Sequence, residues 1–456
     1  MEHPMMDHVK PLTPEFTLDN AAKAWPPVVS KGYSSRFRLS AILSTPVDAH
    51  QLQIASKILS RRFPWFTFKI RAGFFWYYLY KEQCESNLIP ILPGFSPPCV
   101  IPPGYQPLTQ PLVSIHCYGH NLSVEASHII TDGAGLKAYF RCLLLTYGAL
   151  VQTNNTIDDS TTDQLAQFIE SLEDLGTILS PLDPPSQDEW RDDYIYHHLT
   201  KLPKPKKPTK ALHLPVPALA PGHHKVIHGL IPLQPILDLA KSHKVKLGEY
   251  LSAIVLFSLQ QCILELPDKP RKKLIRKPLR LLLPVDLRSH VTSNTMRNFL
   301  AGITIEIDLR LGTYSFEEIL HRVHHVQQAE LDKKFLHQQV SRNVQGEQST
   351  FIRLVPLSLK NLVLRQVFIR LGDMTHTASF SNLGTIELPE FLHRLVSWVG
   401  LTPPPGQVCR MNVTAISFDN TLCLTVGKTT RYSRLEFFIF QFLKNQNLEI
   451  QLYGNG

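Results

Sequence analysis

The alternation of hydrophobic and polar positions predicts a chain that mixes strands with helices. Apolar residues at every second position predict a strand at Ser35–Leu43, and apolar residues at helical spacing predict an amphipathic helix at Ala49–Arg62. The stretch Phe63–Tyr80 is dense in aromatic residues, which favours paired strands, and Pro90–Pro111 is typical of a proline-rich loop. We therefore expect an α/β arrangement in this part of the chain.

The next segment predicts a β-hairpin followed by a helix. Two β-type runs, Leu112–Tyr118 and Leu122–Ile130, are joined by Gly119-His120-Asn121, which is typical of a turn. Gly135–Tyr147 follows, with its apolar residues on one helical stripe. Because side chains of a strand alternate between two faces, His128 falls on the same face as the apolar residues Leu122, Val124, Ala126 and Ile130.

The second half of the chain continues the mixture of strands and helices. Its predicted elements are a strand at Lys225–Ile231, a long helix from Leu233 to Cys262, strands at Leu279–Pro284 and Leu300–Leu309, and a helix at Phe316–Phe335. Two further β-type runs, Val413–Ser417 and Thr421–Val426, are joined by Asp419-Asn420 and precede a helix at Ser433–Lys444.

This last unit repeats the hairpin-then-helix order of residues 112–147, which suggests two structurally related halves. The two copies differ at the point where the chain enters the helix. The first contains His128, whereas the second passes through Lys428-Thr429-Thr430-Arg431 and has no histidine. We therefore expect one catalytic centre rather than two.

A proline-rich basic segment separates the two halves. The run Lys201–Lys210 alternates lysine with proline, and further prolines follow, which is typical of a stiff linker. A chain of 456 residues also exceeds the usual size of a single hydrophobic core. We predict an N-terminal half at 1–200, a linker at 201–224 and a C-terminal half at 225–456, each half a mixed sheet flanked by helices in an α/β (α+β) fold.

Composition narrows the class of protein. Hydrophobic residues make up 43% and charged residues 19%, a globular balance that argues against global disorder. The formal charge of +9 favours anionic partners without identifying one. Aromatic residues are not interleaved with the basic ones as in single-strand nucleic-acid binders, so we expect no nucleic-acid partner.

The cysteines and the chain start bear on the compartment. The seven cysteines form no CxxC pair, and the polar start Met1–Lys10 does not resemble a signal peptide. The longest apolar runs, such as 437–440, are much shorter than the ~20 residues that span a bilayer. We therefore expect a cytoplasmic monomer without a transmembrane segment.

The segment Ser127-His128-Ile129-Ile130-Thr131-Asp132-Gly133 carries the candidate chemistry. An imidazole at the end of an apolar row is partly desolvated, which lowers its pKa and keeps it neutral near pH 7, as a general base requires. Asp132 could cap the following helix or bind a cationic side chain, and Gly133 and Gly135 permit a tight backbone turn. On spacing alone, His128 could equally be a buried core residue.

With its surroundings, this segment resembles the active-site motif of the condensation-domain superfamily of coenzyme-A-dependent acyltransferases, which includes chloramphenicol acetyltransferase. Within that superfamily the chain is most similar to the alcohol-acetyltransferase-like branch. Three other stretches resemble its motifs in family order. They are Leu18–Lys23 with Trp25-Pro26 and Arg36–Leu39, then Pro284-Val285-Asp286-Leu287-Arg288, and Ser381-Asn382-Leu383-Gly384.

The resemblance implies two chloramphenicol-acetyltransferase-like halves with a tunnel between them. His128 would deprotonate a hydroxyl or amine of a small acceptor, which attacks an acyl-CoA thioester without an acyl-enzyme intermediate, and the expected acyl group is acetyl. Asp132 would point away from the substrate and pair with Arg288, and Gly133 would belong to the same structural loop. Ser381 and Asn382 would hydrogen-bond the oxyanion or shape the tunnel, although Asn382 suits a turn equally well.

The resemblance also implies acyl-CoA as a co-substrate, no tightly bound cofactor and a role in secondary metabolism. Three alternatives stay open. The acyl donor could be a carrier protein, although that branch has histidine where Ser127 stands and an Asp-Phe-Gly-Trp-Gly segment that this chain lacks. The protein could be a non-catalytic binder on the same fold. A metal site at His223, His224 and His228 has poor ligand spacing and no acidic partner.

Overall fold

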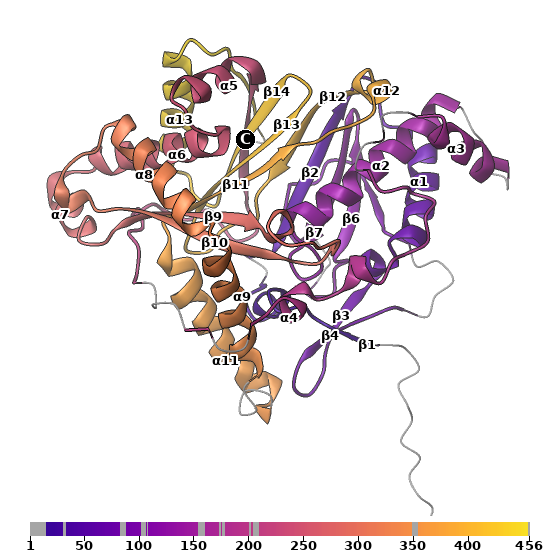
Figure 1. The fold of residues 1–456 in the computed structure, drawn as a ribbon, viewed down its shortest axis with the longest axis horizontal. Helices are drawn as coiled ribbons and strands as arrows, with labels where there is room; N and C mark the ends of the chain where they lie inside the picture. The colour runs from indigo at the N-terminus through magenta and orange to yellow at the C-terminus, as the bar shows by residue number, and fades with distance from the viewer. Residues whose placement is uncertain are drawn as a thin grey trace, which may run out of the picture.

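Two large sheets lie side by side with helices packed around them (Figure 1). The computed structural model describes residues 15–30, 33–82, 88–101, 106, 108–153, 160–172, 175, 178–199, 202–203, 209–348 and 354–454. Part of the predicted basic linker and the chain start lie outside these described residues. The architecture is α/β, with five strands in one sheet, seven in the other and a small three-stranded sheet besides.

The five-stranded sheet forms most of the first half, in the order β12-β2-β7-β6-β5. Its strands are β2 (Arg36–Leu43), β5 (Ile91–Pro93), β6 (Val113–Tyr118), β7 (Asn121–Ser127) and β12 (Val396–Thr402). The helices of this half are α1 (Ala49–Arg62), α2 (Gly133–Thr153) and α3 (Ser160–Glu170). The buried faces of β2, β7, α1 and α2 share one hydrophobic core.

The seven-stranded sheet forms the second half, in the order β10-β9-β11-β13-β14-β8-β15. Its strands are β8 (Lys225–Pro232), β9 (Leu279–Asp286), β10 (Leu300–Ile307), β11 (Ala378–Thr385), β13 (Met411–Phe418), β14 (Thr421–Lys428) and β15 (Gln451–Gly454). The flanking helices are α5 (Leu233–Ser242), α6 (Leu247–Leu264), α7 (Asp268–Leu274), α8 (Phe316–Glu330) and α13 (Arg434–Asn445). Their apolar faces form a second core.

One strand crosses between the halves. β12 comes late in the chain but pairs antiparallel with β2 of the first sheet, Leu401 opposite Leu39. It also packs against β13 and β14. The two sheets are therefore joined by a strand of the second half, and the predicted division at residues 201–224 stays a prediction.

The two halves contain the related units expected from the sequence. β6 and β7 form a hairpin that leads into α2, and β13 and β14 form one that leads into α13. Where the first unit has its histidine, the second has Lys428, which is buried and paired with Glu436. The charge of this lysine is neutralised inside the core, so its place in the fold is structural.

Several predicted boundaries were wrong. The long helix from Leu233 is two helices, α5 and α6, because the chain turns at Lys244 with φ of 60°. The helix predicted at Phe316–Phe335 ends at Glu330, and α9 (Lys333–Gln348) begins after a break. The strand predicted to reach Ile130 ends at Ser127. In each case hydrophobic periodicity continues across a turn that only the tertiary packing defines.

The segment predicted as paired strands at Phe63–Tyr80 begins with a short 3-10 helix, Pro64–Thr67. The hairpin of β3 (Lys69–Ala72) and β4 (Tyr77–Tyr80) follows, with β1 (Glu15–Thr17) alongside β4. This hairpin lies below the main sheets in Figure 1, on the same side as α9 and α11 (Leu357–Val367). α4 (Asp193–Tyr196) lies between α9 and this hairpin.

α6 is the one helix among the described residues that is long and apolar enough to cross a membrane, by length and composition only. Of this helix, 72% is buried inside the protein. Its residues pack against α5, α8 and α13 in the second core. Such a helix, hydrophobic all round, is what the centre of a large domain requires.

Candidate active site

His128 lies immediately beyond β7, at the junction of the two halves. Its backbone N–H donates to the Ser35 carbonyl over 2.9 Å, which continues the ladder between β7 and β2 by one residue. The imidazole is stacked between two aromatic rings. The centroid of the Phe37 ring is 4.4 Å away and that of the Trp25 ring 5.1 Å away, with interplanar angles of 25° and 13°. The ring is thus fixed in one plane.

This aromatic cage controls the protonation of His128. Burial between the rings lowers the pKa of the imidazole to about 4, while the carboxylate of Asp132 and a side-chain hydrogen bond with Asn298 act in the opposite direction. The ring is therefore neutral at pH 7 and able to accept a proton. A pKa this low also makes it a weak base, so the groups that raise the pKa are favourable for proton transfer.

Asp132 points away from the imidazole and into the second half. Its carboxylate binds the two terminal nitrogens of Arg288 at 3.1 and 3.2 Å. It also accepts hydrogen bonds from the backbone N–H groups of Gly135 at 3.0 Å and Phe299 at 2.8 Å. The Gly135 bond caps the first turn of α2, and the Phe299 bond holds the residue before β10. One carboxylate therefore joins this helix to the start of that strand.

Arg288 lies in the turn after β9 and is saturated with acceptors. Beyond Asp132, it donates to the backbone carbonyls of Thr295 at 2.7 Å and Arg297 at 2.5 Å and to the carboxylate of Asp286 at 2.7 Å. These carboxylates raise the pKa of its guanidinium against the effect of burial. The pair is a buried cross-link between the halves rather than a solvated surface contact.

Close backbone contact explains the glycines of the motif. A methyl group on Gly135 would lie 2.2 Å from the Met296 carbonyl oxygen, which itself accepts a 2.6 Å hydrogen bond from the Thr131 hydroxyl. At Gly133 a methyl group would meet only the flexible end of the Leu383 side chain, at 2.8 Å. Gly135 is therefore the stricter requirement, although the sequence drew attention to Gly133.

Asn298 was not identified from the sequence as a site residue. Its amide nitrogen donates to the His128 carbonyl oxygen at 3.0 Å and to the buried carboxylate of Asp19, also at 3.0 Å. The carboxylate of Asp19 in turn accepts from the Ala22 N–H at 2.7 Å, close to Trp25. Asn298 thus connects the aromatic cage, the histidine and the second half. The amide comes from a loop far along the chain, and no local pattern marks it.

Ser381 and Asn382 lie on β11, where they pair with Thr414 and Ala415 of β13. The side-chain carbonyl oxygen of Asn382 accepts a hydrogen bond from the Gly384 N–H at 2.9 Å, and Gly384 has a φ of 67°. This is the turn geometry that Asn favours, which agrees with the structural alternative for Asn382. The next residue, Leu383, contacts helix α2, since its backbone carbonyl accepts from Lys137 Nζ at 2.8 Å.

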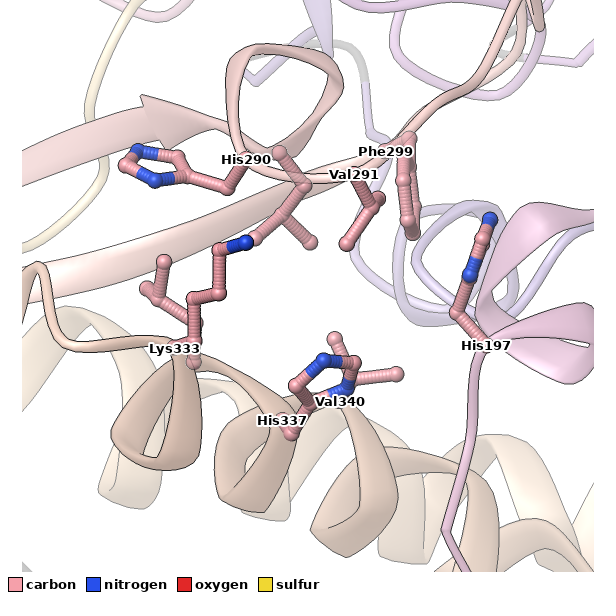
Figure 2. Close-up of a pocket in the computed structure, with 9 residues that line it drawn as sticks. His197, His290, Val291, Phe299, Lys333, His337 and Val340 are labelled. Atoms are coloured by element: carbon pink, nitrogen blue, oxygen red, sulfur yellow. The ribbon is translucent and has the colours of Figure 1, made fainter.

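A small cavity of about 10 Å³ is lined by residues of α9, of the segment after β9 and of the end of α4 (Figure 2). Figure 2 shows His337 and Lys333 reaching into it from α9 and His197 from the end of α4. The ring of His197 stacks on Phe299, with centroids 5.6 Å apart. A space of this size holds about one water molecule, so it is too small for a substrate.

No group of three or more histidine, cysteine or acidic residues in the described part of the chain is arranged to hold a metal ion. Two of the histidines considered for a metal have other contacts. His224 Nδ1 lies 3.3 Å from the Pro98 carbonyl oxygen, and His228 Nδ1 lies 2.9 Å from the Thr425 hydroxyl.

The fold recurs in solved structures of acyl-transferring enzymes. Tri101 from F. sporotrichioides, complexed with coenzyme A and T-2, superposes with a TM-score of 0.59 at 12% identity, over 96% of this chain and 99% of that one. The trichothecene 15-O-acetyltransferase Tri3 from Fusarium sporotrichioides gives 0.55 at 12% identity, over 95% and 93%. The first condensation domain of the CDA synthetase gives 0.54 at 12% identity, over 95% of each chain.

The chain therefore shares the overall fold of these two trichothecene-related proteins and of the condensation domain. No protein-family model matches the sequence, and no curated protein sequence matches it either. At 12% identity these superpositions show the fold and nothing further. The sequence-based expectation of that fold is confirmed.

Proposed function

We propose that this protein transfers an acyl group from a coenzyme A thioester to a hydroxyl or amine of a small acceptor, with His128 as the general base. One observation carries the proposal. A neutral imidazole is fixed between Trp25 and Phe37 at the junction of two condensation-type halves, while Asp132 is turned away from it. That arrangement suits proton transfer by the ring alone.

The chemistry follows from the neutral ring. A ring nitrogen of His128 accepts the proton of the acceptor hydroxyl or amine as its oxygen or nitrogen bonds to the thioester carbonyl carbon. The tetrahedral intermediate then collapses, the carbon–sulfur bond breaks, and the leaving thiolate takes the proton from the imidazolium. The products are the ester or amide and the free thiol of coenzyme A, and no covalent enzyme intermediate is needed.

The remaining residues have structural roles in this proposal. The aromatic cage orients the ring, and Asp132, Gly133 and Arg288 hold the loop that carries it. We propose the tunnel between the halves as the route of both substrates, with Ser381 and Asn382 near its wall. The similarity to structures bound to coenzyme A supports acyl-CoA as the donor.

Thiol release tests the proposal directly. The purified protein is mixed with acetyl-CoA and a panel of alcohols and amines, and free thiol is measured together with the product mass. We expect thiol release that His128→Ala abolishes, and that His228→Gln, a substitution of another neutral histidine, leaves intact. Normal turnover in His128→Ala would show that the base is another group.

A carrier-protein donor is the second candidate, because a peptide-synthetase condensation domain shares the fold. The position of the extra histidine of that branch is held by Ser127, whose hydroxyl lies 2.7 Å from that of Ser35. An acylated carrier protein offered in place of acetyl-CoA separates the two donors.

We also propose a cytoplasmic location, since the six described cysteines are all unpaired and buried.

A further inference from the structure

α11 presents an apolar stripe to solvent. The exposed fractions are 67% for Leu362, 61% for Val363, 57% for Leu359 and 42% for Val367. These residues are three or four positions apart, so they lie on one face of the helix. A helix of a globular protein normally turns such a stripe toward the core. Here the opposite face is the packed one, with Leu357 and Lys360 buried.

The stripe continues onto the β3–β4 hairpin. The Leu357 N–H donates to the Phe74 carbonyl at 2.9 Å, and Lys360 Nζ donates to the Phe75 carbonyl at 2.8 Å. Phe74 is 71% exposed. Figure 1 shows the hairpin and α11 projecting from the same side of the molecule. We call this combined apolar area the tip surface, made of Phe74, Phe75, Leu354, Leu359, Leu362, Val363 and Val367.

The charged residues within α11, its π-helical continuation and the β3–β4 hairpin are all basic. Residues 354–372 contain Lys360, Arg365 and Arg370 and no acidic residue, and the hairpin residues 69–80 contain none either. Arg365 and Arg370 are exposed beside the stripe. An apolar stripe flanked by cations is the pattern of helices that lie in the interface of an anionic membrane. A symmetric contact with a second copy would bring these arginines together, which is unfavourable.

α11 also leads directly to the candidate active site. Its last turn continues into a π-helix, Phe368–Gly372, a conformation that is frequent at functional sites. The ring of Phe368 packs against that of Trp25, with centroids 5.2 Å apart, and Trp25 stacks on His128. Helix α11 therefore connects the exposed stripe with the aromatic residues around the His128 ring.

We propose that the tip surface docks this protein on an anionic phospholipid bilayer. The four apolar side chains of α11 and Phe74 enter the interface between headgroups and acyl chains, and Arg365 and Arg370 contact the anionic headgroups. Docking of this kind is reversible, because it depends on one exposed stripe and a few charges rather than on a spanning helix. It does not depend on the acyl transfer proposed above.

Vesicle sedimentation of the full-length protein tests the docking. We expect the protein to pellet with vesicles of phosphatidylcholine mixed with phosphatidylserine, less with phosphatidylcholine alone, and less again at high salt. Leu362→Asp/Val363→Asp should weaken binding to the mixed vesicles about tenfold or more. Leu311→Asp/Leu452→Asp is the matched control, since these leucines are 78% and 57% exposed elsewhere on the surface.

The second variant keeps the test decisive if the first folds poorly. Arg365→Gln/Arg370→Gln alters only exposed side chains and should reduce binding to the mixed vesicles while leaving the melting temperature unchanged. Equal pelleting of all variants, or no pelleting with either vesicle, would overturn the proposal. So would a dimer by light scattering that Leu362→Asp/Val363→Asp converts to monomer, because the surface would then serve a second copy. Activity on a water-soluble acceptor is measured in parallel without vesicles.

Discussion

Arg288 and Asp132 form a bidentate ion pair across the junction of the halves, with nitrogen–oxygen distances of 3.1 and 3.2 Å. Asp132 simultaneously accepts from two backbone N–H groups, and Arg288 donates to two backbone carbonyls. The pair therefore joins the histidine loop to the turn after β9. Its geometry assigns the charge to holding the loop, since the carboxylate is already saturated.

Asp132→Ala is expected to destabilise the fold. The substitution leaves Arg288 buried without its main partner and removes the cap of α2, which together cost roughly 3–5 kcal/mol. Urea unfolding monitored by circular dichroism measures the loss. If Asp132→Ala retained its unfolding midpoint while thiol release fell, Asp132 would act in the chemistry itself.

Asn298→Ala is expected to move the acid limb of the pH–rate profile to lower pH. The side-chain hydrogen bond with Asn298 raises the pKa of His128, so its loss lowers that pKa further and keeps the ring neutral to lower pH. The maximal rate should fall because the segment that carries the ring loses the amide bound to the His128 carbonyl oxygen. Profiles of kcat/KM against pH measure both effects. An unchanged limb would make Asn298 a purely structural residue, and His228→Gln is the control that should leave the limb in place.

The unfolding free energy is expected to fall as the pH drops from about 6.5 toward 4. Burial lowers the pKa to about 4 for five histidines, His116, His128, His224, His228 and His376. Over this range the unfolded chain binds more protons than the folded one, so acid favours unfolding. Asp373 opposes the trend in part, because burial raises its pKa to about 6.

Urea midpoints at several pH values measure this slope. His228→Gln should reduce it, by at most one proton or about 1.4 kcal/mol per pH unit. A midpoint that stays constant between pH 7 and 5 would contradict the assignment of these histidines as neutral groups with lowered pKa values.

The elements that local pattern determines could be predicted from the sequence. The helix Ala49–Arg62 was predicted with the bounds that the structure shows, and the hairpins before α2 and α13 were also predicted. Each depends on residues close together in the chain. The pairing of β12 with β2 depends on residues about 350 positions apart, and periodicity does not encode partners at that separation.

Only those residues of the candidate site that belong to a short sequence motif could be predicted. His128, Asp132 and Arg288 stand in recognisable segments, but the stacking of His128 on Trp25 and Phe37 arises when three distant segments meet. Asn298 and Gly135 were likewise defined by contacts with Asp19 and Met296 that have no sequence pattern. The exposed stripe of α11 is indistinguishable in sequence from a core-facing one, because periodicity gives a face but not its direction.

Gly135→Ala and Gly133→Ala form a matched pair that tests how closely the halves approach. At Gly135 the added methyl group meets the Met296 carbonyl at 2.2 Å, and a backbone atom can move only if the two loops separate. At Gly133 it meets a leucine side chain that can rotate away. We expect Gly135→Ala to cost about 1–3 kcal/mol and to lower turnover because the loop carrying His128 shifts, and Gly133→Ala to cost less. Melting temperatures and thiol release on both variants measure the difference. Equal effects would mean that helix propensity in the first turn of α2, rather than the contact with Met296, decides the outcome.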